Sequence, residues 1–119
     1  MKTLFFTLSI FLMLQVNAQK KPFYNTQEEI IEAAYLTLDN DLQEGGSLHE
    51  FKSKNQLQGT YSFTLTLQGK GEVVTVYVVD RAGGSIEMQN QLKNYMKGYK
   101  FPFKMPKNKR YQFNYQFKF

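Results

Sequence analysis

The sequence predicts an α+β fold: a three-stranded antiparallel sheet with two helices packed on one face, in the order α-β-β-α-β. Three observations predict it. Apolar and polar residues alternate in residues 60–68 and 111–119, apolar residues recur at helical spacing in 26–46 and 85–98, and a short glycine loop separates two strand-like runs. A chain of 119 residues is long enough for one domain with a modest core.

Residues 1–18 have the pattern of a secretory signal peptide. Lys2 supplies a positive start, an apolar run extends from Leu4 to Val16, and a small-residue cleavage pattern ends at Ala18. The run is shorter than the roughly 20 residues that a membrane-spanning helix needs. We therefore expect an exported protein that is cleaved after Ala18 rather than one held by a retained anchor, with residues 19–119 forming a single domain.

The first helix of that domain is expected in residues 26–46. Thr26 and Glu29 have the spacing of a capping box. Apolar residues then recur on one side of a helix: Ile31, Ala34, Tyr35, Leu38 and Leu42. The pair Gly45-Gly46 ends the helix, with Asp39-Asn40 as an earlier alternative. The domain thus begins with residues 19–56 as this helix and a connection, and we expect residues 47–58 to be irregular.

Residues 60–79 are expected to form a β-hairpin. The first strand alternates apolar with small polar side chains up to Gln68, and the loop Gly69-Lys70-Gly71 turns the chain. The second strand, 73–79, is apolar on both faces, so we expect it to be the more covered of the two.

A second helix and a closing strand complete the predicted domain. Ser85 is a candidate N-cap for the helix, and the stretch 101–110 contains two prolines and is expected to be a loop. In the last strand aromatic residues occupy every second position: Tyr111, Phe113, Tyr115, Phe117 and Phe119. Fully burying one Phe is worth roughly 1.5–3 kcal/mol, so we expect these rings to lie in the core beneath the helices.

Three stretches of the chain resemble TonB-type C-terminal domains. "LQGTYSFTLTLQGKGEVVTVYVV" is similar to the opening hairpin of that family, "LKNYMKGYKFPF" to its helix end, and "KNKRYQFNYQFKF" to its last strand. The resemblance covers residues 57–119. Tyr99 stands where the family usually has Trp, and Phe101 stands at its Phe. The resemblance implies a stand-alone exported relative in the periplasm of a Gram-negative bacterium, with secretion as the alternative, and a link to envelope transport.

The resemblance also implies a binding site. In the family the last strand lies at a sheet edge, where a partner peptide adds as a further strand, and edge strands in general offer unpaired backbone groups for such pairing. Carried over, the docking residues are Tyr111, Gln112, Asn114, Gln116 and Lys118. The expected partner is a protein or peptide of the cell envelope, and a homodimer through edge strands is a variant of the same idea. The alternative is a passive edge whose amides and Lys118 only prevent aggregation.

Charge is unevenly distributed along a chain of formal net charge +5. Most acids lie between Glu28 and Glu50, and none follows Glu87. The basic residues near the end, together with Tyr99 and Tyr111, are candidates for a second function, binding an envelope polyanion such as lipopolysaccharide, glycan or nucleic acid: Lys97, Lys100, Lys104, Lys107, Lys109 and Arg110. Among these polyanions nucleic acid is the least expected.

Catalytic and metal-binding patterns are not found in the sequence. The chain has no Cys and a single His, His49, which leaves no disulfide, no thiol nucleophile and too few ligands for an ordinary zinc site. Ser47 is too close to His49 in sequence to suggest a nucleophile–base pair. The sequence therefore predicts a non-enzymatic protein without a cofactor.

Overall fold

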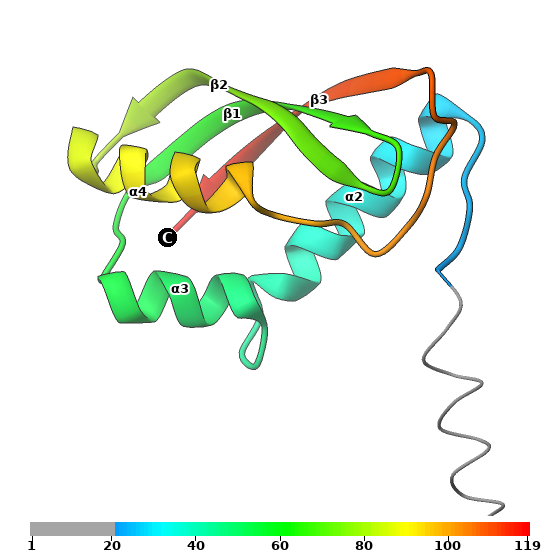
Figure 1. Cartoon of the computed structure of the whole chain (residues 1–119). Helices are drawn as coiled ribbons and strands as arrows, with labels where there is room; N and C mark the ends of the chain where they lie inside the picture. The colour runs from blue at the N-terminus through cyan, green and yellow to red at the C-terminus, as the bar shows by residue number, and fades with distance from the viewer. Residues whose placement is uncertain (1–20) are drawn as a thin grey trace, which may run out of the picture.

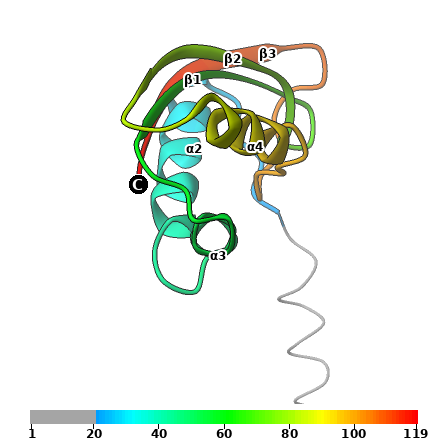
Figure 2. The same ribbon diagram turned by 90° about the vertical axis from the view of Figure 1, so that its left-hand side faces the viewer.

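The computed structural model describes residues 21–119, and the interpretation of residues 1–18 as a signal peptide lies outside them. The described chain has the predicted α+β architecture (Figure 1). Its elements, in order, are α2 (Gln27–Asp41), α3 (Ser47–Asn55), β1 (Thr60–Gln68), β2 (Glu72–Ala82), α4 (Ile86–Lys97) and β3 (Arg110–Lys118). All three helices lie on one face of the sheet, and the other face is open (Figure 2).

The two expected helices begin at the caps that the sequence indicates. The hydroxyl group of Thr26 accepts a hydrogen bond from the amide of Glu29, and the Ser85 hydroxyl accepts one from the amide of Met88. Thr26 also donates to the Glu29 carboxylate, which completes a side-chain version of the capping box. Both helices therefore start where local chemistry satisfies their free amide groups.

The expectation of an irregular connection after the first helix is wrong, because residues 47–55 form α3. Its N-cap, Gly46, provides no side-chain hydrogen bond, and Leu48 is its only buried residue. The missing cap is supplied by a side chain of another helix: the carboxylate of Asp41 accepts from the amide and the hydroxyl of Ser47. Because the capping group comes from outside residues 47–55, the sequence of these residues alone gives little indication of a helix.

The hairpin of β1 and β2 is confirmed, but the relative covering of its strands is the reverse of the expectation. The sheet order is β2-β1-β3, so β1 is central and β2 is an edge, with Tyr77 69% and Val79 55% exposed. The pairing of β2 with β1 shifts register twice, which leaves Val74 and Val79 as extra residues. These bulges explain why β2 reads as a continuous apolar run although only one of its faces is covered.

The stretch expected to be a loop, 101–110, closes one end of the core. Phe101, Phe103 and Met105 are buried. The segment is held to the hairpin loop because the amide of Phe101 donates to the carbonyl of Gly71 and the amide of Met105 donates to that of Gly69. Gly71 has a φ of +81°, and a Cβ there would lie 2.4 Å from the carbonyl oxygen of Phe101. The glycine loop of the hairpin is therefore also the contact surface for this segment.

β3 directs its rings into the core, as the alternation predicts. Phe113, Tyr115 and Phe117 are buried, while Tyr111 and Phe119 at the two ends are half-buried. Phe117 packs against Phe63 of β1 with ring centroids 5.5 Å apart. The intervening residues of β3 are exposed on the open face. The core thus fixes which residues of β3 face solvent.

Candidate functional site

The outer edge of β3 is formed by its even-numbered residues. The amide of Phe119 donates to the carbonyl of Gly59 over 2.9 Å, next to the pair Thr60↔Lys118 in the register. In an antiparallel pair the N–H and C=O of one residue point the same way, and successive residues alternate. The odd-numbered residues therefore direct their backbone groups to β1, and Gln112, Asn114 and Gln116 direct theirs outward. Within residues 21–119 no other strand pairs with that side of β3.

One position of this edge is covered by a side chain of α2. The hydroxyl group of Tyr35 donates to the backbone carbonyl of Asn114. The Tyr35 ring packs against Phe113 and Tyr115 with centroid distances of 5.5 and 5.6 Å, yet the side chain remains 38% exposed. The edge is therefore open on both sides of one central acceptor that is already occupied.

α2 borders the edge for most of the length of β3. Gln27 lies with Tyr111 and Gln112 in one hollow at the beginning of the strand. Near the end of the strand, Gln43, which follows the C-cap of α2, lines a groove together with Gln116 and Lys118. Between these points Asp39 accepts a hydrogen bond from the Tyr115 hydroxyl. The helix and the strand consequently run side by side in the same direction, with a groove along the edge.

The structure brings most of the docking residues expected from the sequence into one row. Gln112, Asn114, Gln116 and Lys118 are exposed on the open face, whereas Tyr111 points to the opposite, helix-covered face and is half-buried. The Asn114 side chain accepts a hydrogen bond from the Thr64 hydroxyl of β1, and the side-chain amide of Gln116 donates to the Ser62 hydroxyl over 3.5 Å. These cross-strand bonds hold the amide side chains over the sheet, so the edge itself is left to backbone groups.

The six basic residues predicted as a polyanion site are all exposed. Only Arg110, the first residue of β3, lies at the strand edge, and the other five lie outside the groove. They lie on the segment from the end of α4 to the start of β3, which crosses one end of the sheet (Figure 1). The backbone of Lys100 pairs with that of Glu72 in an isolated β-bridge. The backbone of Lys104 forms hydrogen bonds with Pro22 and Tyr24. The segment is thus fixed in place with its positive charges outward.

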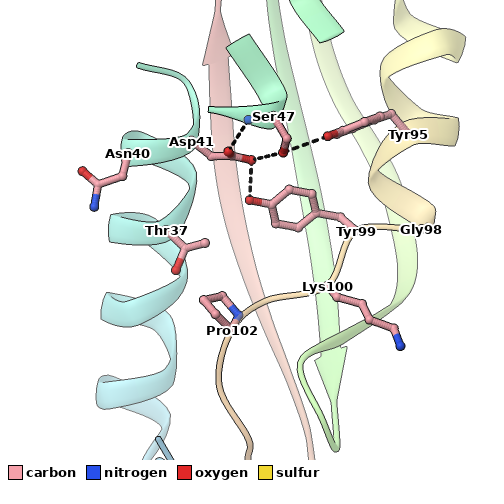
Figure 3. A pocket seen from close by; sticks show the side chains of 9 residues that line it. All are labelled: Thr37, Asn40, Asp41, Ser47, Tyr95, Gly98, Tyr99, Lys100 and Pro102. Atoms are coloured by element: carbon pink, nitrogen blue, oxygen red, sulfur yellow. Dashed lines mark hydrogen bonds between the residues drawn. The ribbon is translucent and has the colours of Figure 1, made fainter. Parts of the chain in front are cut away.

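A separate pocket lies where α2, α3 and the end of α4 meet (Figure 3). The Asp41 carboxylate accepts hydrogen bonds from the Ser47 amide at 2.7 Å, the Ser47 hydroxyl at 2.8 Å and the Tyr99 hydroxyl at 2.7 Å. Tyr95 donates to the Ser47 hydroxyl at 3.0 Å. The polar groups at the centre of the pocket therefore pair with one another and join three helical segments.

The hydrogen bonds at the centre of this pocket shift the pKa values of Asp41 and Tyr99 in opposite directions. Burial acts to raise the pKa of the Asp41 carboxyl group, but hydrogen bonds from Tyr99, Ser47 and the backbone outweigh it and hold the pKa below 3.8. Burial and the bond to Asp41 raise the pKa of the Tyr99 hydroxyl. A carboxylate whose pKa is lowered in this way is a weaker base towards the Ser47 hydroxyl than an ordinary aspartate. His49 faces elsewhere, with Nδ1 3.3 Å from the carbonyl oxygen of Leu42.

Sequence reasoning missed the two residues that organise these sites. Tyr35 was assigned only to the apolar stripe of the first helix, although a buried or half-buried Tyr hydroxyl usually finds a partner. That rule signals a partner for Tyr35 but does not identify Asn114. Asp41 and Tyr99 are 58 residues apart, so no local spacing indicates their contact.

Comparisons with protein-family models, with curated proteins and with solved structures found no match for the chain. In residues 21–119 no helix combines the length and the apolar character needed to cross a membrane. The same residues contain no group of three or more His, Asp or Glu side chains placed to hold a metal ion. Within the described residues, the open edge of β3 is the feature that points to a function.

Proposed function

We propose that the protein is an exported, non-enzymatic interaction module of the cell envelope that binds an extended segment of a partner by adding it to β3 as a fourth strand. The observation that carries this proposal is the outward direction of the backbone groups of Gln112, Asn114 and Gln116 along an edge that no strand within residues 21–119 occupies. Export to the periplasm and a link to envelope transport follow from the leader pattern and from the resemblance to TonB-type domains.

Strand addition at this edge requires one local exchange. An arriving N–H group opposite Asn114 replaces the Tyr35 hydroxyl at the Asn114 carbonyl, so that position contributes little net free energy. Backbone hydrogen bonds at the flanking residues each contribute about 0.5–1.5 kcal/mol net. A partner that spans the edge from Gln112 to Gln116 therefore gains affinity from several main-chain bonds, and its specificity comes from side chains on either face.

Substituting Asn114 tests the proposal. Because the amide of Asn114 points away from β1, Asn114→Pro removes an outward donor without breaking a bond of the sheet, and proline is tolerated at such edge positions. Asn114→Ala is the matched control, since it removes the side-chain bond to Thr64 but keeps the amide. We expect immobilised wild-type and Asn114→Ala protein to capture the same envelope protein, and Asn114→Pro to lose it. Capture by a folded Asn114→Pro variant would contradict docking at this edge.

A second candidate function is binding of an envelope polyanion through the basic segment. It is favoured by the exposure of every basic residue from Lys97 to Arg110 on one continuous segment that contains no acid. Polyanion binding weakens steeply with salt, because it depends on the release of counterions. Capture that survives high salt supports strand addition, and capture abolished by salt but not by Asn114→Pro supports the basic segment. A second copy of the chain is the remaining occupant of the edge, and it is revealed by concentration-dependent dimerisation.

A further inference from the structure

We infer that α2 selects the strand that adds to β3, and that the selected strand carries Lys or Arg at alternate positions on the side facing α2. This inference rests on the proposed function, since it concerns the side chains of the segment that binds the same edge. It is carried by the order of residues around α2, by their exposure and by the charge of the helix.

The flank of α2 beside β3 has an apolar inner stripe and an acidic outer stripe. Tyr35 marks the direction of the edge through its bond to Asn114. Successive helix residues are turned by about 100°. Ile31 lies one turn before Tyr35 on nearly the same side, whereas Glu28 and Glu32 lie further from the core. Glu28, Ile31, Glu32 and Tyr35 line one hollow, as this placement requires.

This hollow continues into the groove along β3. Tyr35 lines both hollows. Beyond Tyr35 the groove is lined by Asp39 on the α2 side and by Asn114 and Lys118 on the β3 side. Glu28, Glu32 and Asp39 are exposed, and α2 contains no Lys, Arg or His from Gln27 to Asp41. The charged residues on the α2 bank of the groove, opposite the strand edge, are therefore all acidic.

An added strand would present its side chains to this bank in a defined way. Strands lie about 4.8 Å apart, and successive side chains point to opposite faces of the sheet. One set extends over the open face beside Gln112 and Gln116, and the other set points to the α2 side. A side chain on that side meets Ile31 and Tyr35 first and the carboxylates of Glu28 or Glu32 beyond them.

Lys and Arg match that order of surfaces. Their aliphatic stems cover apolar surface while the charged head reaches water or a carboxylate. An acidic side chain in the same place would face charges of its own sign, and a short apolar one would leave the outer stripe unpaired. The chemistry of the bank therefore favours a cationic, long-stemmed side chain at every second position of the partner.

The test uses two synthetic peptides of nine residues, one alternating Thr with Lys and the other with Gln in place of every Lys. Each is titrated into the isotope-labelled protein, and binding is followed by NMR through the backbone amide signals of β3. We expect the Lys peptide to bind about tenfold more tightly, because several exposed charge pairs, each weak alone, add to this difference. We expect the shifted signals to include the amides of Gln112, Asn114 and Gln116.

Charge removal on α2 provides the decisive comparison. In the double variant Glu28→Gln/Glu32→Gln the advantage of the Lys peptide should fall to less than about threefold. The control Glu50→Gln/Glu87→Gln removes the same charge from exposed residues of α3 and α4 and should keep the advantage. Glu29 is left unchanged because it belongs to the cap of α2.

The possible failures separate the inference from the proposed function. If both peptides bind equally and both are lost in Asn114→Pro, strand addition stands and selection by α2 is wrong. If the Lys peptide binds as well to Asn114→Pro as to the wild-type protein, it adheres to the acidic helix without adding a strand, which contradicts both. If neither peptide binds at millimolar concentration, both are again contradicted.

Discussion

Replacing Phe117 by Ala is expected to lower the free energy of unfolding by about 3–5 kcal/mol. Phe117 is completely buried, and its ring packs against Phe63 and Tyr115 with centroid distances of 5.5 and 4.8 Å. The neighbouring rings belong to strands held in fixed register, so they cannot move inward to fill the space. The substitution therefore leaves a cavity in addition to the lost burial of the ring.

The change is measured by urea unfolding followed by circular dichroism, with the midpoint compared at constant slope. Phe23→Ala is the control, because the Phe23 side chain is 59% exposed and the same substitution should cost less than about 1 kcal/mol. A cost below about 1 kcal/mol for Phe117→Ala would place that ring outside the core. The backbone of β3 would then not be oriented as the proposed edge requires.

Replacing Asp41 by Asn is expected to lower the free energy of unfolding by about 1–2 kcal/mol at neutral pH. The carboxylate accepts three hydrogen bonds that hold α2, α3 and the end of α4 together, and bonds to a charged acceptor are stronger than neutral ones. The value stays modest because Asp41 is partly exposed to solvent. Glu44→Gln removes an exposed carboxylate from the same turn and should have little effect.

The same residue predicts a dependence on pH. The pKa of Asp41 is lower in the folded protein than its ordinary value of 3.8, so its contribution to stability is complete above that value and is lost as the pH falls through the folded pKa. The difference in stability between wild-type protein and Asp41→Asn should therefore shrink below about pH 4. A difference that is constant from pH 7 to pH 3 would show that the carboxylate is not held by these bonds.

Local patterns in the sequence predicted most of the architecture. The alternation in residues 111–119 predicted a strand whose rings are buried, and Thr26 and Ser85 predicted the starts of two helices, because each signal lies within a few residues of its effect. The helix α3 could not be predicted in this way. Its cap comes from Asp41, six residues before Ser47 and across a Gly-Gly turn, and its sequence is largely polar.

The position of β2 was misjudged for a related reason. A continuous apolar run usually indicates a strand covered on both faces. Here two bulges change the alternation, so that Val73, Val76 and Val78 pair with core residues of β1 while Tyr77 stays exposed. Bulges depend on the pairing of two strands, and the sequence of one strand does not reveal them.

The candidate site was predicted only in part. The even-numbered polar residues of β3 were expected at the edge, and the structure places them there with outward backbone groups. Tyr35 occupies the carbonyl of Asn114, 79 positions away in the sequence. The placement of the acidic side of α2 beside β3 likewise comes from tertiary packing. Such contacts determine how open the edge is and which partners suit it. They cannot be predicted from local patterns in the sequence.

The most direct test of the open edge is amide hydrogen exchange along β3 in the monomeric protein, measured by NMR. We expect an alternation: the amides of Phe113, Tyr115 and Phe117, which face β1, exchange slowly, and those of Gln112, Asn114 and Gln116 exchange quickly. Addition of a partner strand should slow the second set. Equal, slow exchange of both sets in the free monomer would mean that the edge is already closed, and strand addition at β3 would be contradicted.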